Sequence, residues 1–162
     1  MPIRYMAAVL LVDDVTVAKA FYESLLGQEV IMDHGGVHVV FEGGFAIWQA
    51  DRAYAVLFEG REPPSGPLGS DNAELYFEAE NLDDAWKVMT NNGVTIVHSM
   101  IEQPWGQRCF RVKDPDGHIV EVGEPMWVVI RRFLGEGLDV RETAKRTSMP
   151  LDIIQEIAEG MG

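Results

Sequence analysis

Residues 114–122 read Asp-Pro-Asp-Gly-His-Ile-Val-Glu-Val, a turn followed by an apolar strand that carries one carboxylate. Pro115 presets the φ angle of a tight turn, and Gly117 supplies the positive φ that such turns often need. The preceding residues 107–112 are rich in β-branched and aromatic side chains. This pattern predicts an antiparallel hairpin that joins residues 107–112 to residues 118–123.

The elements predicted around this hairpin occur twice along the chain, in the same order. A strand, an amphipathic helix and three further strands are expected in residues 5–50, and again in residues 73–124. Between them, residues 60–70 contain three prolines and three glycines, so residues 51–72 are predicted to be a linker. The sequence therefore predicts an α+β fold, with two βαβββ modules in residues 1–124.

Local signals give the expected bounds of these elements. Asp13 or Asp14 and, in the second module, Asn81 suit the N-terminus of a helix, while Gly27 and Gly93 suit its end. The first strand is expected to be buried. The strands are expected at residues 5–12, 28–32, 37–41, 45–49, 74–79, 95–100, 107–112 and 118–123.

Composition restricts the possible partners and compartment. The chain has 162 residues, of which 47% are hydrophobic, enough for a substantial core. Its net charge of −13 disfavours binding to nucleic acid or to an anionic membrane surface. The longest apolar run, Met6 to Val12, is far shorter than the roughly 20 residues that span a bilayer. Cys109 is the only cysteine and no signal-peptide pattern is found, so a cytoplasmic location is expected.

Three segments carry a family resemblance. Phe21 to Gly27 resembles the first-helix signature of the vicinal oxygen chelate superfamily, which includes glyoxalases, bleomycin-resistance proteins and extradiol dioxygenases. Trp105 to Arg108 and Asp114 to His118 resemble its closing hairpin. The resemblance covers about residues 5–124 and implies paired modules that curl around a small-molecule cleft, often through an exchange of modules between two chains. A homodimer is therefore expected.

The resemblance also implies four positions that hold a divalent metal in many members. Glu74 and Glu121 match two of them, whereas the other two fall on Ala7 and on Trp48 or Gln49. Two carboxylates without imidazole or thiolate are a poor ligand set, because Zn²⁺ prefers nitrogen or sulfur and Ca²⁺ or Mg²⁺ needs about six oxygens. No metal is favoured, but Glu74 and Glu121 are the candidate ligands, and the candidate catalytic residues, if the protein is an enzyme.

Charged and aromatic side chains supply candidate ligand contacts. With residues 114–117 as the hairpin loop, Phe110 faces Glu121, Arg108 lies diagonally across from Glu121, and Cys109 faces the other side. Arg108 then either forms a structural ion pair or binds a ligand carboxylate or phosphate. Glu74 either faces the cleft or is an exposed edge residue. The expected ligand-binding residues are Glu74, Tyr76, Trp48, Trp105, Arg108, Glu121 and His38.

Residues 125–162 extend beyond the family resemblance and are predicted to form three helices, at 126–134, at 140–146 and from Pro150 onward. The last two resemble a helix-turn-helix. The third helix carries only acidic charges, which disfavours contact with phosphate. The helices are instead expected to pack on the outer side of the sheet, on a partner subunit or over the cleft.

Three functions remain open at this point. The first is a metal-free binding protein of the bleomycin-resistance type, favoured by Ala7 and by the net charge. The second is a metal-dependent lyase, isomerase or dioxygenase, favoured by the two glutamates. The third is a ligand-sensing regulatory module with a helical interaction tail.

Overall fold

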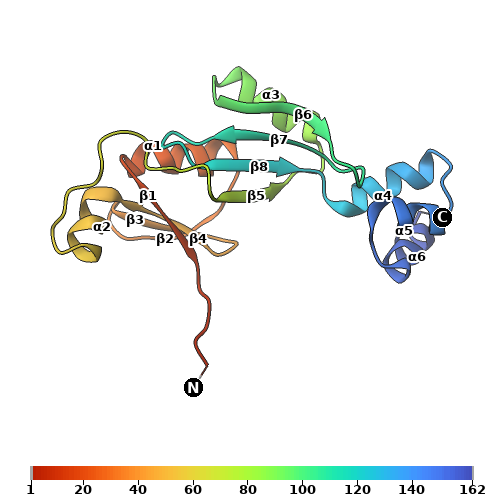
Figure 1. Ribbon diagram of the computed structural model, residues 1–162, viewed down its shortest axis with the longest axis horizontal. Coiled ribbons are helices and arrows are strands. Elements are labelled where there is room, and N and C mark those ends of the chain that lie inside the picture. Colours follow the sequence, from red (N-terminus) through yellow and green to blue (C-terminus); the bar gives the residue numbers. More distant parts are fainter. Residues whose placement is uncertain (1, 162) are drawn as a thin grey trace. The chain divides into compact units, whose positions relative to one another are not determined.

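The computed structural model describes residues 2–161 and contains two four-stranded sheets of the same topology (Figure 1). The strand orders are β1-β4-β3-β2 and β5-β8-β7-β6. In each sheet the first strand of the module pairs with its fourth, followed by the third and the second. This repeated order confirms the prediction of an α+β fold built from two βαβββ modules.

The first module begins with a strand that is shorter and more exposed than predicted. β1 starts at Ala8 instead of residue 5, and its only neighbour in the sheet is β4, so it is an edge strand. Val9 is 44% exposed whereas Val12 is fully buried, so the expectation of a buried first strand is wrong for most of its length. The elements of this part of the chain are β1 (Ala8–Val12), α1 (Val15–Ala20), a π-helical turn η1 (Phe21–Leu25), β2 (Val30–Asp33), β3 (His38–Phe41), β4 (Phe45–Gln49) and α2 (Ala50–Leu57).

The first helix forms as its sequence predicts. The Asp14 carboxylate accepts hydrogen bonds from the backbone N–H groups of Thr16 and Val17, at 2.8 and 3.2 Å. Gly27 ends the helical segment with φ +65°. The fully buried ring of Tyr22 lies 5.8 Å from that of Phe41, in the core between helix and sheet.

Helix α2 occupies part of the segment that was predicted to be a linker. Its buried side chains are the small residues Ala50 and Ala53, while Val56 and Leu57 remain exposed. Two alanines give a weak helical signal, which explains why the sequence analysis missed the helix. Further along, the Gly69 N–H donates to the Asp116 carbonyl at 2.9 Å, so the end of this segment is held against the hairpin turn.

The second module follows the predicted order closely. Asn81 caps its helix by accepting a hydrogen bond from the Asp84 N–H, and Gly93 follows the helix with φ +66°. The Trp86 and Phe110 rings lie 5.1 Å apart, where helix meets sheet. Its elements are β5 (Glu74–Glu78), α3 (Leu82–Asn91), β6 (Thr95–Glu102), β7 (Arg108–Lys113) and β8 (Ile119–Gly123).

The hairpin of β7 and β8 differs from the prediction by one residue of register. The Asp114 N–H donates to the His118 carbonyl at 3.0 Å, so these two residues pair and the loop contains three residues. Three positions away from this pair on each strand, in the direction away from the turn, Arg111 lies opposite Glu121. The predicted pairings of Phe110 and Arg108 with Glu121 are therefore wrong, because a one-residue slip exchanges the two faces of a strand. Cys109 shares the face of Glu121, contrary to expectation.

The tip of this hairpin, residues 113–119, groups with residues 1–73 in one compact unit, while residues 74–112 and 120–162 form the other. Asp114 is buried at the tip. Its carboxylate accepts hydrogen bonds from the Tyr22 hydroxyl at 2.7 Å and from the His118 N–H at 2.8 Å. Burial alone raises the pKa of Asp114, but its bonds to His118 and Tyr22 lower it overall. The turn sequence thus supplies part of the core of the first unit.

Three helices follow the second sheet, as predicted: α4 (Met126–Gly135), α5 (Val140–Thr147) and α6 (Leu151–Glu159). Helix α4 packs against the β6–β7 loop, where Arg132 donates to the Gly106 carbonyl at 2.5 Å and to the Glu124 carboxylate at 3.2 Å. The Glu124 side chain also binds Arg108 at 2.7 Å. Glu124 thereby joins the sheet to the C-terminal helices. No helix in residues 2–161 is long and apolar enough to span a membrane.

Candidate functional site

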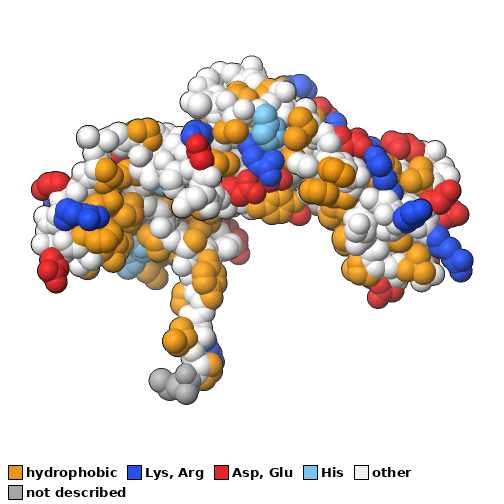
Figure 2. Space-filling view, in the orientation of Figure 1, with side chains coloured by type: hydrophobic (Ala, Val, Ile, Leu, Met, Phe, Trp, Pro, Cys, Tyr) orange, Lys and Arg blue, Asp and Glu red, His pale blue; other side chains and the backbone are white. Residues whose placement is uncertain are grey.

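One arginine joins three strands on the face of the second sheet that points away from α3. Arg111 donates from Nε to Glu74 on β5 at 2.8 Å, from Nη2 to Glu121 on β8, and from Nη1 to His98 on β6 at 3.1 Å. Figure 2 shows basic, acidic and histidine atoms side by side over these strands. We call these four residues the Arg111 cluster.

The hydrogen bonds of His98 define its tautomer. Its Nδ1 lies 2.8 Å from the Ser99 carbonyl, which can only accept, so Nδ1 carries the proton. Nε2 is then free to accept from Arg111. His98 thereby completes the binding of the guanidinium through Nε2.

The two carboxylates of the cluster differ in their environment. The Glu121 side chain is only 9% exposed, and burial raises its pKa above the ordinary value despite the nearby Arg111. The Glu74 side chain is 40% exposed, and its hydrogen bond from Arg111 lowers its pKa. Hydrogen bonding to Glu74 raises the pKa of Arg111 itself. Glu121 is thus the carboxylate that takes up a proton first as the pH falls.

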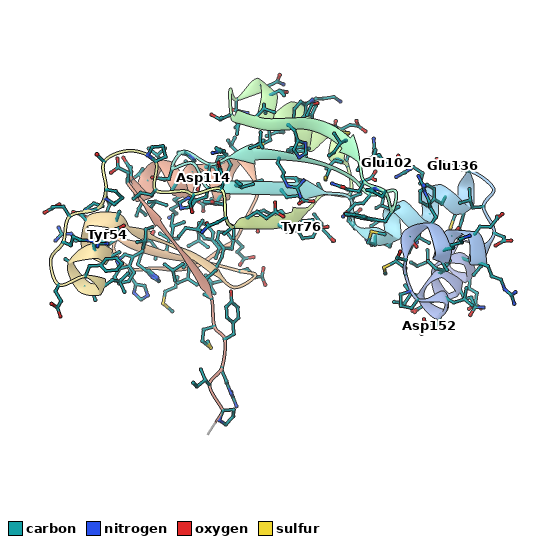
Figure 3. The ribbon with its side chains drawn as sticks, viewed as in Figure 1. Tyr54, Tyr76, Glu102, Asp114, Glu136 and Asp152 are labelled. Carbon is teal, nitrogen blue, oxygen red and sulfur yellow. The ribbon has the colours of Figure 1, made fainter. Side chains whose placement is uncertain are left out.

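A chain of hydrogen bonds extends from this face to the β6–β7 loop. The Trp105 indole N–H donates to Gln107 at 3.0 Å, and the Gln107 amide donates to the Tyr76 hydroxyl at 2.7 Å and to the Glu124 carbonyl at 2.8 Å. The Tyr76 hydroxyl donates to Glu78 at 3.0 Å. Figure 3 labels Tyr76 on β5. Burial and Glu78 raise the pKa of Tyr76 to about 12, so it stays protonated at neutral pH.

The structure brings together only part of the predicted ligand-binding set. Glu74, Tyr76 and Glu121 lie on one face of the second sheet, with Trp105 linked to Tyr76 through Gln107. Arg108 lies on the opposite face of β7 and binds Glu124, not Glu121. Its role in ligand binding stays a prediction, but the pairing on which that role was based is wrong.

The remaining predicted residues lie in the first unit. His38 and Trp48 are directly opposite each other on β3 and β4, with their rings 5.7 Å apart at a right angle. Burial, and then the neighbouring His34, lower the pKa of His38. The two residues therefore form an aromatic pair of their own, and their part in ligand binding stays a prediction.

Arg111, His98, Gln107 and Glu78 were not among the ligand-binding residues predicted from the sequence. Arg111 was missed because the assumed loop length placed Arg108 beside Glu121. Gln107 was missed because an amide in a strand has no motif of its own, although its alternation with Cys109 and Arg111 places all three on one face once the register is known.

The donor set does not fit a resident divalent metal. Both carboxylates at the implied ligand positions already bind Arg111, whose charge opposes that of a metal ion. Ala7 has no donor side chain, and Gln49 bonds to the Val15 N–H and the Asp13 carbonyl. Within residues 2–161, no group of three or more His, Cys, Asp or Glu side chains could hold a metal ion. Instead, the face combines an excess of acidic charge with the partly exposed ring of Tyr76.

Comparisons with known proteins agree with this fold. A family model described as a glyoxalase-like domain matches residues 5–127. A solved protein of unknown function from Agrobacterium tumefaciens is 34% identical, with a TM-score of 0.70 over 77% of this chain and 96% of its own. A member of the glyoxalase/bleomycin resistance protein/dioxygenase superfamily from Sphaerobacter thermophilus is 26% identical, with a TM-score of 0.55 over 77% of this chain and 99% of its own. An uncharacterized Mycobacterium tuberculosis protein is 28% identical over 123 residues, 72% of each chain.

Proposed function

Because this chain belongs to the glyoxalase-like domain family of the vicinal oxygen chelate superfamily, we propose that it binds a small molecule on the face that carries the Arg111 cluster, without a metal. The observation that carries the proposal is the position of Arg111. Its guanidinium lies between Glu74 and Glu121, the two carboxylates that correspond to metal ligands in the superfamily. A binding role that needs no metal is consistent with this arrangement.

The charges of the face favour a ligand that is cationic or rich in hydrogen-bond donors. Glu74, Glu78 and Glu121 supply three carboxylates, whereas Arg111 supplies a single guanidinium. Arg111 is already bound by carboxylates, so it has little capacity left for an anionic ligand. Tyr76 is 48% exposed and offers an aromatic surface to an apolar part of the ligand or to a cation.

The alternative is a metal-dependent lyase, isomerase or dioxygenase that uses Glu74 or Glu121 as a ligand or base. It would require Arg111 to release both carboxylates when the metal binds. The two possibilities differ in a direct measurement: the metal content of the purified protein after incubation with Mn²⁺, Zn²⁺, Fe²⁺ or Ni²⁺, for the wild type and for Glu121→Ala. Stoichiometric metal that is lost in Glu121→Ala would overturn the proposal.

The binding role itself is tested by a thermal-shift screen of small amines and neutral aromatic compounds. We expect compounds that raise the wild-type Tm to lose most of their effect in Glu74→Gln. In Glu80→Gln, a matched change at an exposed glutamate next to α3, the effect should be retained. Hits that act equally on all three proteins would place the ligand elsewhere and contradict the proposal.

We further propose that the protein forms a homodimer. The support is the N-terminal arm before β1, where the side chains of Ile3, Tyr5 and Met6 are 101%, 78% and 79% exposed. Apolar side chains next to an edge strand favour association with another chain. Light scattering after size exclusion should show a dimer for the wild type and a monomer after Tyr5→Ser with Met6→Ser; a wild-type monomer would contradict this proposal.

A further inference from the structure

A cavity of about 520 Å³ lies in the second unit between the β6–β7 loop and α5. It is lined by Pro104 and Trp105 from the loop and by Glu142, Lys145, Arg146 and Ser148 from α5 and its C-terminal end. Most of this lining lies beyond residues 5–127, which the family model covers. The cavity is therefore a feature of the C-terminal extension and is separate from the Arg111 cluster.

The lining carries basic groups that are available to a ligand, in a protein whose net charge is −13. Within the described part of the chain, Lys145 has no ion-pair partner. Arg146 lies 3.5 Å from Glu102, in a pair whose two side chains are 50% and 43% exposed, so this contact is weak. The one acidic side chain of the lining, Glu142, is held at the N-terminus of α5, where its carboxylate accepts the Asp139 N–H at 2.8 Å in a capping box.

The loop side of the cavity presents an aromatic face. Trp105 is 40% exposed, while its only polar group, the indole N–H, already donates to Gln107. What remains for a ligand is the flat surface of the ring, with Pro104 beside it. Such a surface favours stacking of a second planar ring.

We propose that this cavity binds a small aromatic anion, such as an aryl carboxylate, with its ring against Trp105 and its anionic group between Lys145 and Arg146. The aromatic wall and the basic wall come from different elements, so only a ligand with both features contacts both. The volume is in the range of small-molecule sites. The site uses none of the residues of the Arg111 cluster, so this proposal does not depend on whether that cluster binds a ligand.

The test uses 1-naphthoate as the probe and follows the indole N–H signals of the four tryptophans by ¹H–¹⁵N NMR. Trp105→Phe assigns the Trp105 signal. We expect 1-naphthoate to shift this signal saturably, and the matched neutral compound 1-naphthalenemethanol to bind more weakly. In Lys145→Gln the dissociation constant for 1-naphthoate should rise about two- to fivefold, as expected for the loss of one exposed charge partner.

The control is Lys87→Gln, a lysine on α3 that pairs with Asp84 and does not line the cavity. It should leave the dissociation constant unchanged. The proposal is overturned if 1-naphthoate leaves the Trp105 signal unmoved, if the neutral compound binds as tightly, or if Lys145→Gln and Lys87→Gln behave alike.

Discussion

Arg111 lies opposite Glu121 across the β7–β8 pair, and its guanidinium binds the carboxylate of Glu121 while also binding Glu74. One cation thus compensates two acidic groups on a face that carries a third, Glu78. The two glutamates that bind Arg111 differ strongly in exposure, because Glu121 is buried and Glu74 is not. This asymmetry determines how the site responds to mutation and to pH.

Arg111→Met should lower the free energy of unfolding by about 2 kcal/mol at pH 7.5, because it leaves Glu121 buried without a cation. The pKa of Glu121 is already above its ordinary value of 4.5, and it will rise further without Arg111. The loss in the free energy of unfolding is complete above this raised pKa, where Glu121 is ionised. It becomes smaller as the pH falls through the raised pKa, because Glu121 is then protonated. Urea unfolding at pH 7.5 and pH 5 measures both effects, with Arg141→Met at an exposed position as the control. A loss of equal size at both pH values would contradict the role assigned to Glu121.

Glu124→Gln should cost about 2–3 kcal/mol at neutral pH, because it removes the charge that binds both Arg108 and Arg132. Burial acts to raise the pKa of Glu124, but the hydrogen bonds from Arg108 lower it overall. The contribution of Glu124 is therefore present above 4.5, its ordinary pKa, and is lost as the pH falls through the lower folded value. Chemical unfolding at pH 7 and pH 3.5 should show the difference between wild type and variant shrinking. Glu136→Gln, at an exposed partner of Arg132, should change little.

Tyr22→Phe should destabilise the protein by about 1–2 kcal/mol, because the buried Asp114 carboxylate loses its hydrogen bond from the Tyr22 hydroxyl. The phenyl ring keeps the contacts with the core, so the effect isolates the hydroxyl. Thermal unfolding followed by circular dichroism is a sufficient measurement. Tyr54→Phe is the control. If it destabilises the protein as much as Tyr22→Phe does, the destabilisation is unrelated to the hydrogen bond with Asp114.

Gly106→Ala should destabilise the junction between the β6–β7 loop and α4. A Cβ at Gly106 would lie 2.2 Å from Cζ of Phe133, and the φ of +89° is unfavourable for alanine. We expect a loss of about 1–3 kcal/mol. Gly135→Ala, where no atom lies within 4 Å of the added Cβ, should be neutral or stabilising. Equal unfolding midpoints for the two variants would show that Phe133 moves aside without cost.

Local signals in the sequence predicted most of the fold. The Asp14 and Asn81 caps and the helix ends at Gly27 and Gly93 depend on a few neighbouring residues, and all four were predicted correctly. The repeat of the module was predicted because both copies retain the same order of such signals. Helix α2 was missed, since its packing depends on alanines, which are common in exposed and buried helices alike.

The site was less predictable because it depends on register. Arg108 and Arg111 are three positions apart on β7, so they lie on opposite faces of the strand, and the sequence alone does not show which of them shares a face with Glu121 on β8. Only the pairing of Asp114 with His118, which shortens the loop to three residues, decides between them. A loop length is a tertiary property of the turn and its surroundings, so a motif alone does not determine it.

The hairpin tip has one further consequence, for how the chain can be divided. Residues 113–119 belong to the second repeat in sequence, yet they supply the carboxylate that accepts the hydrogen bond of the Tyr22 hydroxyl in the first unit. A chain cut after Ala73 would therefore separate the first repeat from part of its own interior. The two repeats share one plan but are not interchangeable building blocks, and the first half should recover its structure by fragment complementation with the second rather than by folding alone.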